Sequence, residues 1–334
     1  MRILSIDGGG MRGIIPGTAL VAFEKKLQTI SGNQDLRIAD AFDLIAGTST
    51  GGILTCLYLS PDKLTGRPKY SAKEAVDLYL QDGDNIFDVS SYKRIQSLDG
   101  LTDEKYSADA IEAALKKYLG DLKLSDLLKP CFITAYDITR RQAQFFNGAD
   151  VAAKGSGWDF YLRDVARATS AAPTYFEPAN ISALDRKVYP LIDGGVFANN
   201  PAMCACIEAF NLKPGLKVTD LQVLSIGTGA VDKSYHYSEA KSWGKLGWVV
   251  PVVDIMMSGV SETVDFQLQQ LFKSAGCSDQ YLRLQLDLKD FTDVDSEMDN
   301  ASERNMRALE RAGQTLARDS DDKLTAFATM LLGS

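Results

Sequence analysis

The stretch that decides the fold reads Phe42-Asp43-Leu44-Ile45-Ala46-Gly47-Thr48-Ser49-Thr50-Gly51-Gly52. Its apolar beginning predicts a buried strand, and the apolar residues 53–59 that follow predict a helix directly after it. The middle fits G-x-S-x-G, the strained strand-to-helix turn that presents a nucleophilic serine. Gly47 and Gly51 supply the small residues that this turn needs on either side of Ser49. We therefore expect Ser49 at the end of a strand, with the positive end of a helix dipole directed at it.

Strands and helices alternate along the rest of the chain. Further strands are expected at residues 2–6, 131–136, 144–146, 188–192, 221–226 and 281–286. Helices are expected at residues 14–30, 72–81, 108–118, 158–169, 201–209, 252–272 and 301–317. This alternation predicts an α/β fold with a mostly parallel central sheet. No linker divides the sequence, so we expect one domain over residues 1–334, with a core of about 1–230 on which the helices and strand of 231–334 pack.

The composition is that of a globular protein and excludes several classes. The formal charge is −8 with a pI near 4.9, which argues against nucleic acid as a partner. The five cysteines show no paired-ligand spacing, so we expect neither a disulfide framework nor a metal site. We see no signal sequence and no run of roughly 18 apolar residues that could span a membrane. A cytoplasmic protein is the expectation, and any contact with the inner membrane surface would be transient and made by a local apolar patch.

A glycine loop follows the first expected strand and allows two interpretations. Gly8, Gly10 and Gly13 fit G-x-G-x-x-G, a pattern typical of dinucleotide-binding proteins when it lies between a strand and a helix. Asp7 argues against a nucleotide, because it places a carboxylate beside the amides that would receive the pyrophosphate. The acidic residue expected about 20 positions later is also missing, since Asp35 has the spacing but no strand before it. We therefore expect no cofactor.

The alternative interpretation is an oxyanion hole. Gly8, Gly9 and Gly10 let the backbone approach a ligand closely and turn its N–H groups outward. The start of the next helix adds a positive dipole end. Arg12 either adds positive charge to this hole or forms a structural ion pair, for example with Asp7, and the sequence leaves these two roles open.

Ser49 needs a base, and histidine is an unpromising candidate. The only histidine, His236, lies in a polar segment with no pattern that would hold a catalytic imidazole. Asp193 stands at the end of an expected strand, ahead of Gly194 and Gly195. A buried carboxylate can accept the serine proton if burial raises its pKa. Taken alone, Asp193 could equally be a turn residue before glycine.

Three motifs in order resemble the patatin-like phospholipases. They are Asp7-Gly8-Gly9-Gly10-Met11-Arg12-Gly13, Gly47-Thr48-Ser49-Thr50-Gly51-Gly52 and Asp193-Gly194-Gly195. Supporting matches are Ala168-Thr169-Ser170-Ala171-Ala172-Pro173-Thr174-Tyr175-Phe176, Asn199-Asn200-Pro201 and Leu224-Ser225-Ile226-Gly227-Thr228-Gly229. The resemblance spans residues 1 to about 320.

The resemblance implies a three-layer patatin-like fold with helices on both faces of the sheet. It implies a Ser-Asp dyad of Ser49 and Asp193, supported by Gly47, Gly51, Gly194 and Gly195. The oxyanion hole would be formed by Gly8, Gly9, Gly10 and Arg12. The implied activity is metal-independent removal of acyl chains from membrane phospholipids, of phospholipase A or lysophospholipase type, through an acyl-enzyme. The chain also looks like short bacterial members that resemble anti-phage (CBASS-type) effectors switched on by a cyclic dinucleotide; a homo-oligomer is compatible with the sequence.

Several alternatives remain open at this point. A nicotinamide-dependent oxidoreductase would use the glycine loop, and a storage or binding protein would keep the fold without catalysis. A peptidase or thioesterase would share the serine chemistry. Ser170 is a rival nucleophile without the G-x-S-x-G turn. The apolar run 249–257 is expected to be buried core, with a lid or membrane-contact segment as the alternative.

Overall fold

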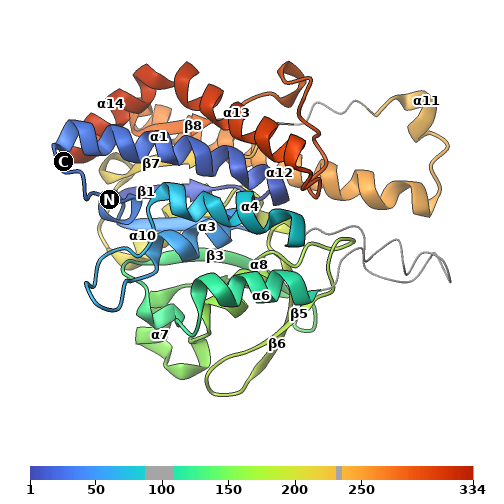
Figure 1. Ribbon diagram of the computed structural model, residues 1–334, viewed down its shortest axis with the longest axis horizontal. Helices are drawn as coiled ribbons and strands as arrows, with labels where there is room; N and C mark the ends of the chain where they lie inside the picture. The colour runs from blue at the N-terminus through green and yellow to red at the C-terminus, as the bar shows by residue number, and fades with distance from the viewer. Residues whose placement is uncertain (87–107, 231–234, 334) are drawn as a thin grey trace.

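An eight-stranded sheet runs through the part of the chain that the computed structural model describes, residues 1–86, 108–230 and 235–333 (Figure 1). Its strands are β1 (Arg2–Ile6), β2 (Leu44–Thr48), β3 (Cys131–Asp137), β4 (Gln142–Phe146), β5 (Ala179–Ser182), β6 (Val188–Asp193), β7 (Gln222–Ile226) and β8 (Tyr281–Leu284). Hydrogen-bonded neighbours follow the order β5-β6-β3-β2-β1-β7-β8, and β4 also pairs with β3. The neighbours β3, β2, β1, β7 and β8 pair in parallel. β4 and β6 each pair with β3 in antiparallel fashion, and so does β5 with β6.

Helices cover both faces of this sheet, because its central strands are apolar on both sides. The helices are α1 (Ile14–Ser31), α2 (Ile38–Ala41), α3 (Thr50–Leu59), α4 (Ala72–Ile86), α6 (Ala108–Leu119), α7 (Gly148–Lys154), α8 (Leu162–Thr169), α9 (Gly195–Ala198), α10 (Ala202–Leu212), α11 (Tyr237–Ala240), α12 (Lys245–Ser274), α13 (Glu303–Asp319) and α14 (Asp321–Leu332). Leu4 of β1 packs into one core with α1, α3 and α13, and its neighbour Ile3 packs into a second core with α10 and α12. The expected three-layer α/β architecture with a mostly parallel sheet is therefore confirmed.

The C-terminal part packs on the sheet and helices of the first 230 residues. β8 continues the sheet beyond β7, and α13 lies along α1. Within the described residues, no helix combines the length and apolar character needed to cross a bilayer. A single domain stays a prediction, and part of the boundary expected near residue 231 lies outside the described residues.

Some expected elements differ from the observed ones. β5, α7 and α14 were not expected from the sequence. A helix was expected from residue 158, whereas Trp158 closes a 3₁₀ turn and α8 begins at Leu162. The helix expected at 252–272 extends from Lys245 to Ser274 with Pro251 inside it.

The expectation of a buried core for the run 249–257 is wrong. Val252, Ile255 and Met256 of α12 are 40%, 46% and 47% exposed. The run has the composition of a core segment, but the structure turns one side of it to solvent.

Candidate active site

Ser49 occupies the sharp turn between β2 and α3. Its backbone has φ 55° and ψ −123°, a conformation that a non-glycine residue adopts only under constraint. Close backbone packing explains the flanking glycines: a Cβ on Gly51 would lie 2.1 Å from the carbonyl oxygen of Ile6, and one on Gly47 would lie 2.1 Å from that of Gly51. The serine thus sits at the N-terminus of α3, where the helix dipole favours developing negative charge.

The ends of β2 and β6 meet on the same edge of β3. Thr48 of β2 lies opposite Thr134 in a parallel pairing. Asp193 of β6 lies opposite Ala135 in an antiparallel pairing, while β4 occupies the other edge of β3 beside both. Because Thr134 and Ala135 are neighbours, the two strands arrive from opposite directions at one point. This register brings Ser49, the residue after Thr48, to Asp193.

The carboxylate of Asp193 is buried beside the Ser49 side chain. Burial raises the pKa of Asp193 to about 7, against the opposing effect of hydrogen bonds from the Ser49 side chain and the Gly195 N–H. The Gly195 bond to Oδ1 is 2.7 Å long. Gly194 is required for packing, since a Cβ there would lie 2.0 Å from Oγ1 of Thr134. A carboxylate with this pKa can hold or release a proton near neutral pH.

Buried threonines join the elements that carry Ser49 and Asp193. Oγ1 of Thr169, at the end of α8, accepts the Ser49 N–H at 2.9 Å and donates to the Thr134 carbonyl at 2.7 Å. The hydroxyls of Thr48 and Thr134 are 2.7 Å apart, and Thr48 also bonds to the Ala198 carbonyl at 2.6 Å. The positioning role of Thr169 was not expected from the sequence; the one indication of it was that Thr169 belongs to the Ala168–Phe176 match of the resemblance.

The glycine loop lies directly against Ser49, but the N–H of its first glycine, Gly8, already has a hydrogen-bond acceptor. A Cβ on Gly8 would lie 3.1 Å from that of Ser49. The Gly8 N–H, expected in the oxyanion hole, donates instead to the Asn199 carbonyl at 3.1 Å. No partner for the N–H groups of Gly9 and Gly10 is found among the described residues. These two amides are therefore available to donate to a ligand, and Gly10 lines the cavity that contains Ser49.

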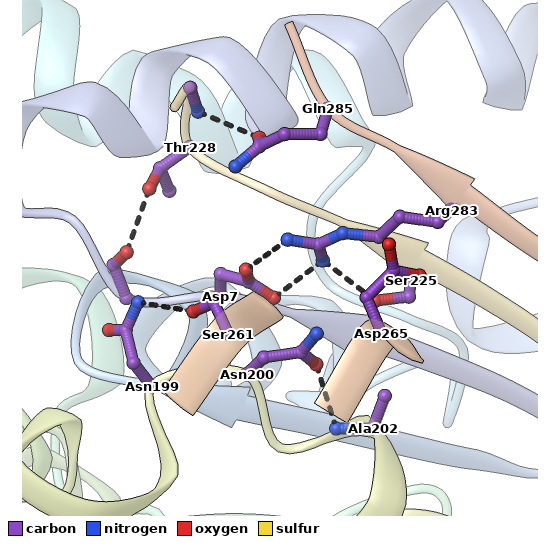
Figure 2. Close-up of polar contacts among 12 residues, drawn as sticks. Asp7, Asn199, Asn200, Ala202, Ser225, Thr228, Ser261, Asp265, Arg283 and Gln285 are labelled. Atoms are coloured by element: carbon purple, nitrogen blue, oxygen red, sulfur yellow. Dashed lines mark hydrogen bonds and ion pairs between the residues drawn. The ribbon is translucent and has the colours of Figure 1, made fainter. Parts of the chain in front are cut away.

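Arg12 takes neither of the two roles expected for it. Its buried guanidinium points to the carbonyl oxygens of Gly9 and Gly229, both at 3.4 Å, and burial lowers its pKa. Asp7 pairs with Arg283 of β8 through two contacts of 2.9 and 2.6 Å (Figure 2). Arg12 thus joins the glycine loop to the turn at Gly229, and it lines a neighbouring pocket with Asp7 and Asp254 and not the cavity that contains Ser49.

The turn after β7 holds the glycine loop in place. Thr228 donates a 2.7 Å hydrogen bond to the Gly8 carbonyl, and the Gly229 N–H donates to Oε1 of Gln285 at 3.0 Å (Figure 2). Gly9 packs so closely on Thr228 that a Cβ would lie 2.3 Å from its hydroxyl oxygen. These contacts explain why the Leu224–Gly229 motif accompanies the glycine loop: its Thr228 and Gly229 hold the loop in place.

Asn199 links the glycine loop to α12. Its carbonyl holds the Gly8 N–H, and its Nδ2 donates to Oγ of Ser261 at 3.1 Å (Figure 2). The side-chain oxygen has no hydrogen-bond partner among the described residues, and it lies beside Gly8 and Gly195. No role for Asn199 was expected from the sequence beyond the supporting match Asn199-Asn200-Pro201, in which the Oδ1 of Asn200 accepts the Ala202 N–H at 3.0 Å where α10 begins.

Ser49 and Asp193 open into a cavity whose walls are almost entirely apolar. α4, α6 and α12 contribute the side chains of Leu78, Tyr79, Ile111, Leu115, Val253 and Met257. Ser170 also lines this cavity, but its hydroxyl donates to the Ala166 carbonyl at 2.7 Å. His236 is exposed at the start of α11 and is not among the lining residues. In the described ranges, no cluster of three or more His, Cys, Asp or Glu side chains could hold a metal ion.

Comparisons with known proteins agree with this arrangement of motifs. The family model for patatin-like phospholipase matches residues 4–205. Patatin-like protein 2 from Oryza sativa subsp. indica is 34% identical, covering 95% of this chain and 83% of that protein. Patatin-T5 from Solanum tuberosum is 33% identical, covering 97% and 85%. Among solved structures, VipD from Legionella pneumophila aligns over 94% of this chain and 66% of its own, at 10% identity and a TM-score of 0.37, too low to carry an argument.

The family model covers more than half of the chain, and the relatives match nearly all of it above 30% identity. The chain belongs to the patatin-like phospholipase family.

Proposed function

We propose that this protein is a lipid acyl hydrolase of phospholipase A or lysophospholipase type, with Ser49 as nucleophile and Asp193 as base. Family membership supports hydrolysis of lipid esters. The observation that carries the finer proposal is the buried contact between the Ser49 side chain and an Asp193 carboxylate whose pKa is about 7.

In the acylation step, Asp193 would first accept a proton from Ser49 and then donate it to the leaving alcohol. Oγ of Ser49 attacks the carbonyl carbon of the ester while its proton passes to Asp193. The carbonyl oxygen becomes an oxyanion that accepts hydrogen bonds from the Gly9 and Gly10 amides. When the tetrahedral intermediate collapses, the ester C–O bond breaks and the protonated Asp193 gives its proton to the leaving alcohol. The acyl chain stays on Ser49.

Deacylation repeats the cycle with water. Asp193 accepts a proton from water as its oxygen attacks the acyl-Ser49 carbonyl. Breakdown of the second intermediate releases the fatty acid and returns the proton to Oγ of Ser49. The apolar cavity supports a fatty-acyl substrate, because an acyl chain placed there loses contact with water.

The first experiment measures fatty-acid release from mixed phospholipid vesicles and from a soluble short-chain ester. We expect Ser49→Ala and Asp193→Asn each to abolish both activities, because the two residues act as one unit. Ser170→Ala is the matched variant from the same cavity wall, and it should retain activity. Activity that survives in Ser49→Ala but disappears in Ser170→Ala would overturn the assignment.

Activation by a cyclic dinucleotide in anti-phage defence is also proposed, and it rests on the sequence resemblance alone. Vesicle hydrolysis should rise when cyclic dinucleotides are added one at a time, and the assembly state should be followed by light scattering in parallel. Constitutive activity with no response to any of them would remove this part of the proposal. If the purified protein showed the absorbance of a bound nicotinamide cofactor, the oxidoreductase alternative would be favoured. If the folded wild type hydrolysed none of these substrates, a storage or binding protein would be favoured.

A further inference from the structure

α11 and the first half of α12 form an arm, residues 235–260, that extends beyond the sheet (Figure 1). Aromatic rings hold the arm together: Tyr235 contacts Trp243 and Trp243 contacts Trp248, edge to face at 5.3 and 5.0 Å between centroids. The Tyr235 hydroxyl donates to Asp254 at 3.0 Å and so ties the start of the arm to α12. The arm therefore has internal structure and presents a defined outer face.

The outer face of the first half of α12 is apolar, and Phe266 adds one exposed ring farther along the helix. Its exposed large side chains are Trp248, Val252, Ile255, Met256 and Phe266, with exposed fractions from 40% to 64%. Their spacing follows the helical repeat and places them on one side of α12, with the exposed Gly259, Glu262 and Thr263 between Met256 and Phe266. We call these five side chains the stripe. Among the described side chains from Trp248 to Phe266, Glu262 is the only exposed charge. Exposed stripes of this kind mark contact surfaces rather than ordinary solvent-facing helices.

The inner face of the same helix lines the cavity that contains Ser49. Val253 and Met257 lie among its wall residues. The terminal carbon of Met257 would lie 3.2 Å from a Cβ on Gly195, next to Asp193. Two successive turns of α12 thus face the cavity on one side and solvent on the other.

We propose that the stripe Trp248, Val252, Ile255, Met256 and Phe266 docks the protein on the surface of a lipid bilayer, with α12 lying in the plane of the interface. This proposal rests on the proposed function, since a lipid ester must pass from a bilayer to Ser49. Helices that lie in the interface insert their apolar face among the headgroups and upper acyl chains, and tryptophan is favoured there. Docking on this face brings the bilayer beside the cavity wall that Val253 and Met257 form.

The position of the stripe favours a lipid surface over a second copy of the chain. The stripe adjoins the wall of the acyl cavity, so a protein seated on it would separate that wall from the bilayer. The lack of charge on the stripe and the net charge of −8 on the chain indicate the type of attachment: binding should depend on apolar insertion and not on anionic headgroups.

The test measures binding to vesicles by flotation, with Ser49→Ala throughout so that the lipid is not consumed. The vesicles are phosphatidylcholine alone or phosphatidylcholine with phosphatidylglycerol. In this background we expect Ile255→Glu with Phe266→Glu to weaken binding by about tenfold or more, because charges replace inserted apolar groups. Ile207→Glu is the matched control: Ile207 is 53% exposed on α10, outside the arm, and its replacement should leave binding unchanged.

In proteins that retain Ser49, the ratio of vesicle hydrolysis to soluble-ester hydrolysis should fall by a similar factor in the variant with Ile255→Glu and Phe266→Glu. Unchanged vesicle binding in this stripe variant would overturn the proposal. So would binding that requires phosphatidylglycerol and disappears at high salt, or a wild-type dimer that the two stripe substitutions separate. Failure of the wild type to cleave the soluble ester would overturn the proposed function and leave the binding result standing.

Discussion

The N–H of Ser49 donates a 2.9 Å hydrogen bond to Oγ1 of Thr169, which donates in turn to the Thr134 carbonyl at 2.7 Å. Thr169 is fully buried at the end of α8. It therefore holds the backbone of the strained serine turn to the strand beside which Asp193 ends. This bond makes the geometry of Ser49 depend on a residue that contributes no group to the chemistry.

Thr169→Val should lower kcat by about tenfold or more and change KM little, because Ser49 shifts relative to Asp193. The loss of one partner should also cost about 1–3 kcal/mol of unfolding free energy, since the Ser49 N–H is then buried without an acceptor. Thr169→Ser keeps the hydroxyl and should recover most of the activity. Steady-state kinetics on a soluble ester and urea unfolding measure both effects. Equal activity in the valine and serine variants would show that the bond does not position Ser49.

The pH profile should report Asp193. Burial raises its pKa to about 7, and only the ionised form can accept the Ser49 proton. The value of kcat/KM for a soluble ester should therefore fall about tenfold for each pH unit below about 7 and level off above it. A rate that stays constant from pH about 8 to about 5 would mean that a group with an ordinary carboxylate pKa, or none, acts as the base.

The same shift predicts that Asp193 destabilises the folded protein at alkaline pH. Its pKa rises from 3.8 in the unfolded chain to about 7 in the folded one, so the folded state holds the proton more tightly. The contribution of Asp193 to the unfolding free energy is therefore fully present below about pH 4 and is lost as the pH rises to about 7. Asp193→Asn should raise the unfolding free energy by a few kcal/mol at pH about 8, and by much less near pH 4. Denaturant unfolding at the two pH values measures this, and a variant less stable at both would contradict it.

Arg283 is predicted to stabilise the glycine loop through Asp7. The pair is buried, and although burial lowers the pKa of Arg283, attraction and hydrogen bonds from Asp7 raise it overall. Arg283→Met should cost about 3–5 kcal/mol of unfolding free energy, because it leaves the Asp7 carboxylate buried without its counter-charge. The double variant Asp7→Asn with Arg283→Met should recover part of that loss. Denaturant unfolding in which the double variant loses as much as the two single variants together would exclude this coupling.

Much of the fold could be predicted because local sequence determines it. The buried central strands are continuous apolar runs, and the turn at Ser49 is recognisable because Gly47 and Gly51 are sterically required. Of the antiparallel strands, β4 and β6 were expected and β5 was not, and how any of the three would pair could not be predicted. The meeting of Asp193 with Ser49 depends on which strand pairs with β3 and in which register, and register between distant segments leaves little trace in either segment.

Two further differences concern the direction of side chains, which is set by tertiary contacts. Arg12 was expected at the oxyanion or paired with Asp7, but Asp7 is taken by Arg283 and Arg12 points to backbone carbonyls. The apolar run 249–257 was expected inside the core. Composition alone cannot distinguish a core segment from one exposed to solvent.

The measurement that tests the central claim most directly is covalent trapping with a fluorophosphonate probe, followed by mapping of the labelled peptide. We predict one label per chain, on Ser49, absent in Ser49→Ala and much slower to form in folded Asp193→Asn. The label should form faster as the pH rises through about 7, in parallel with turnover. A label on Ser170 or any other residue, with ester hydrolysis persisting in Ser49→Ala, would contradict the account.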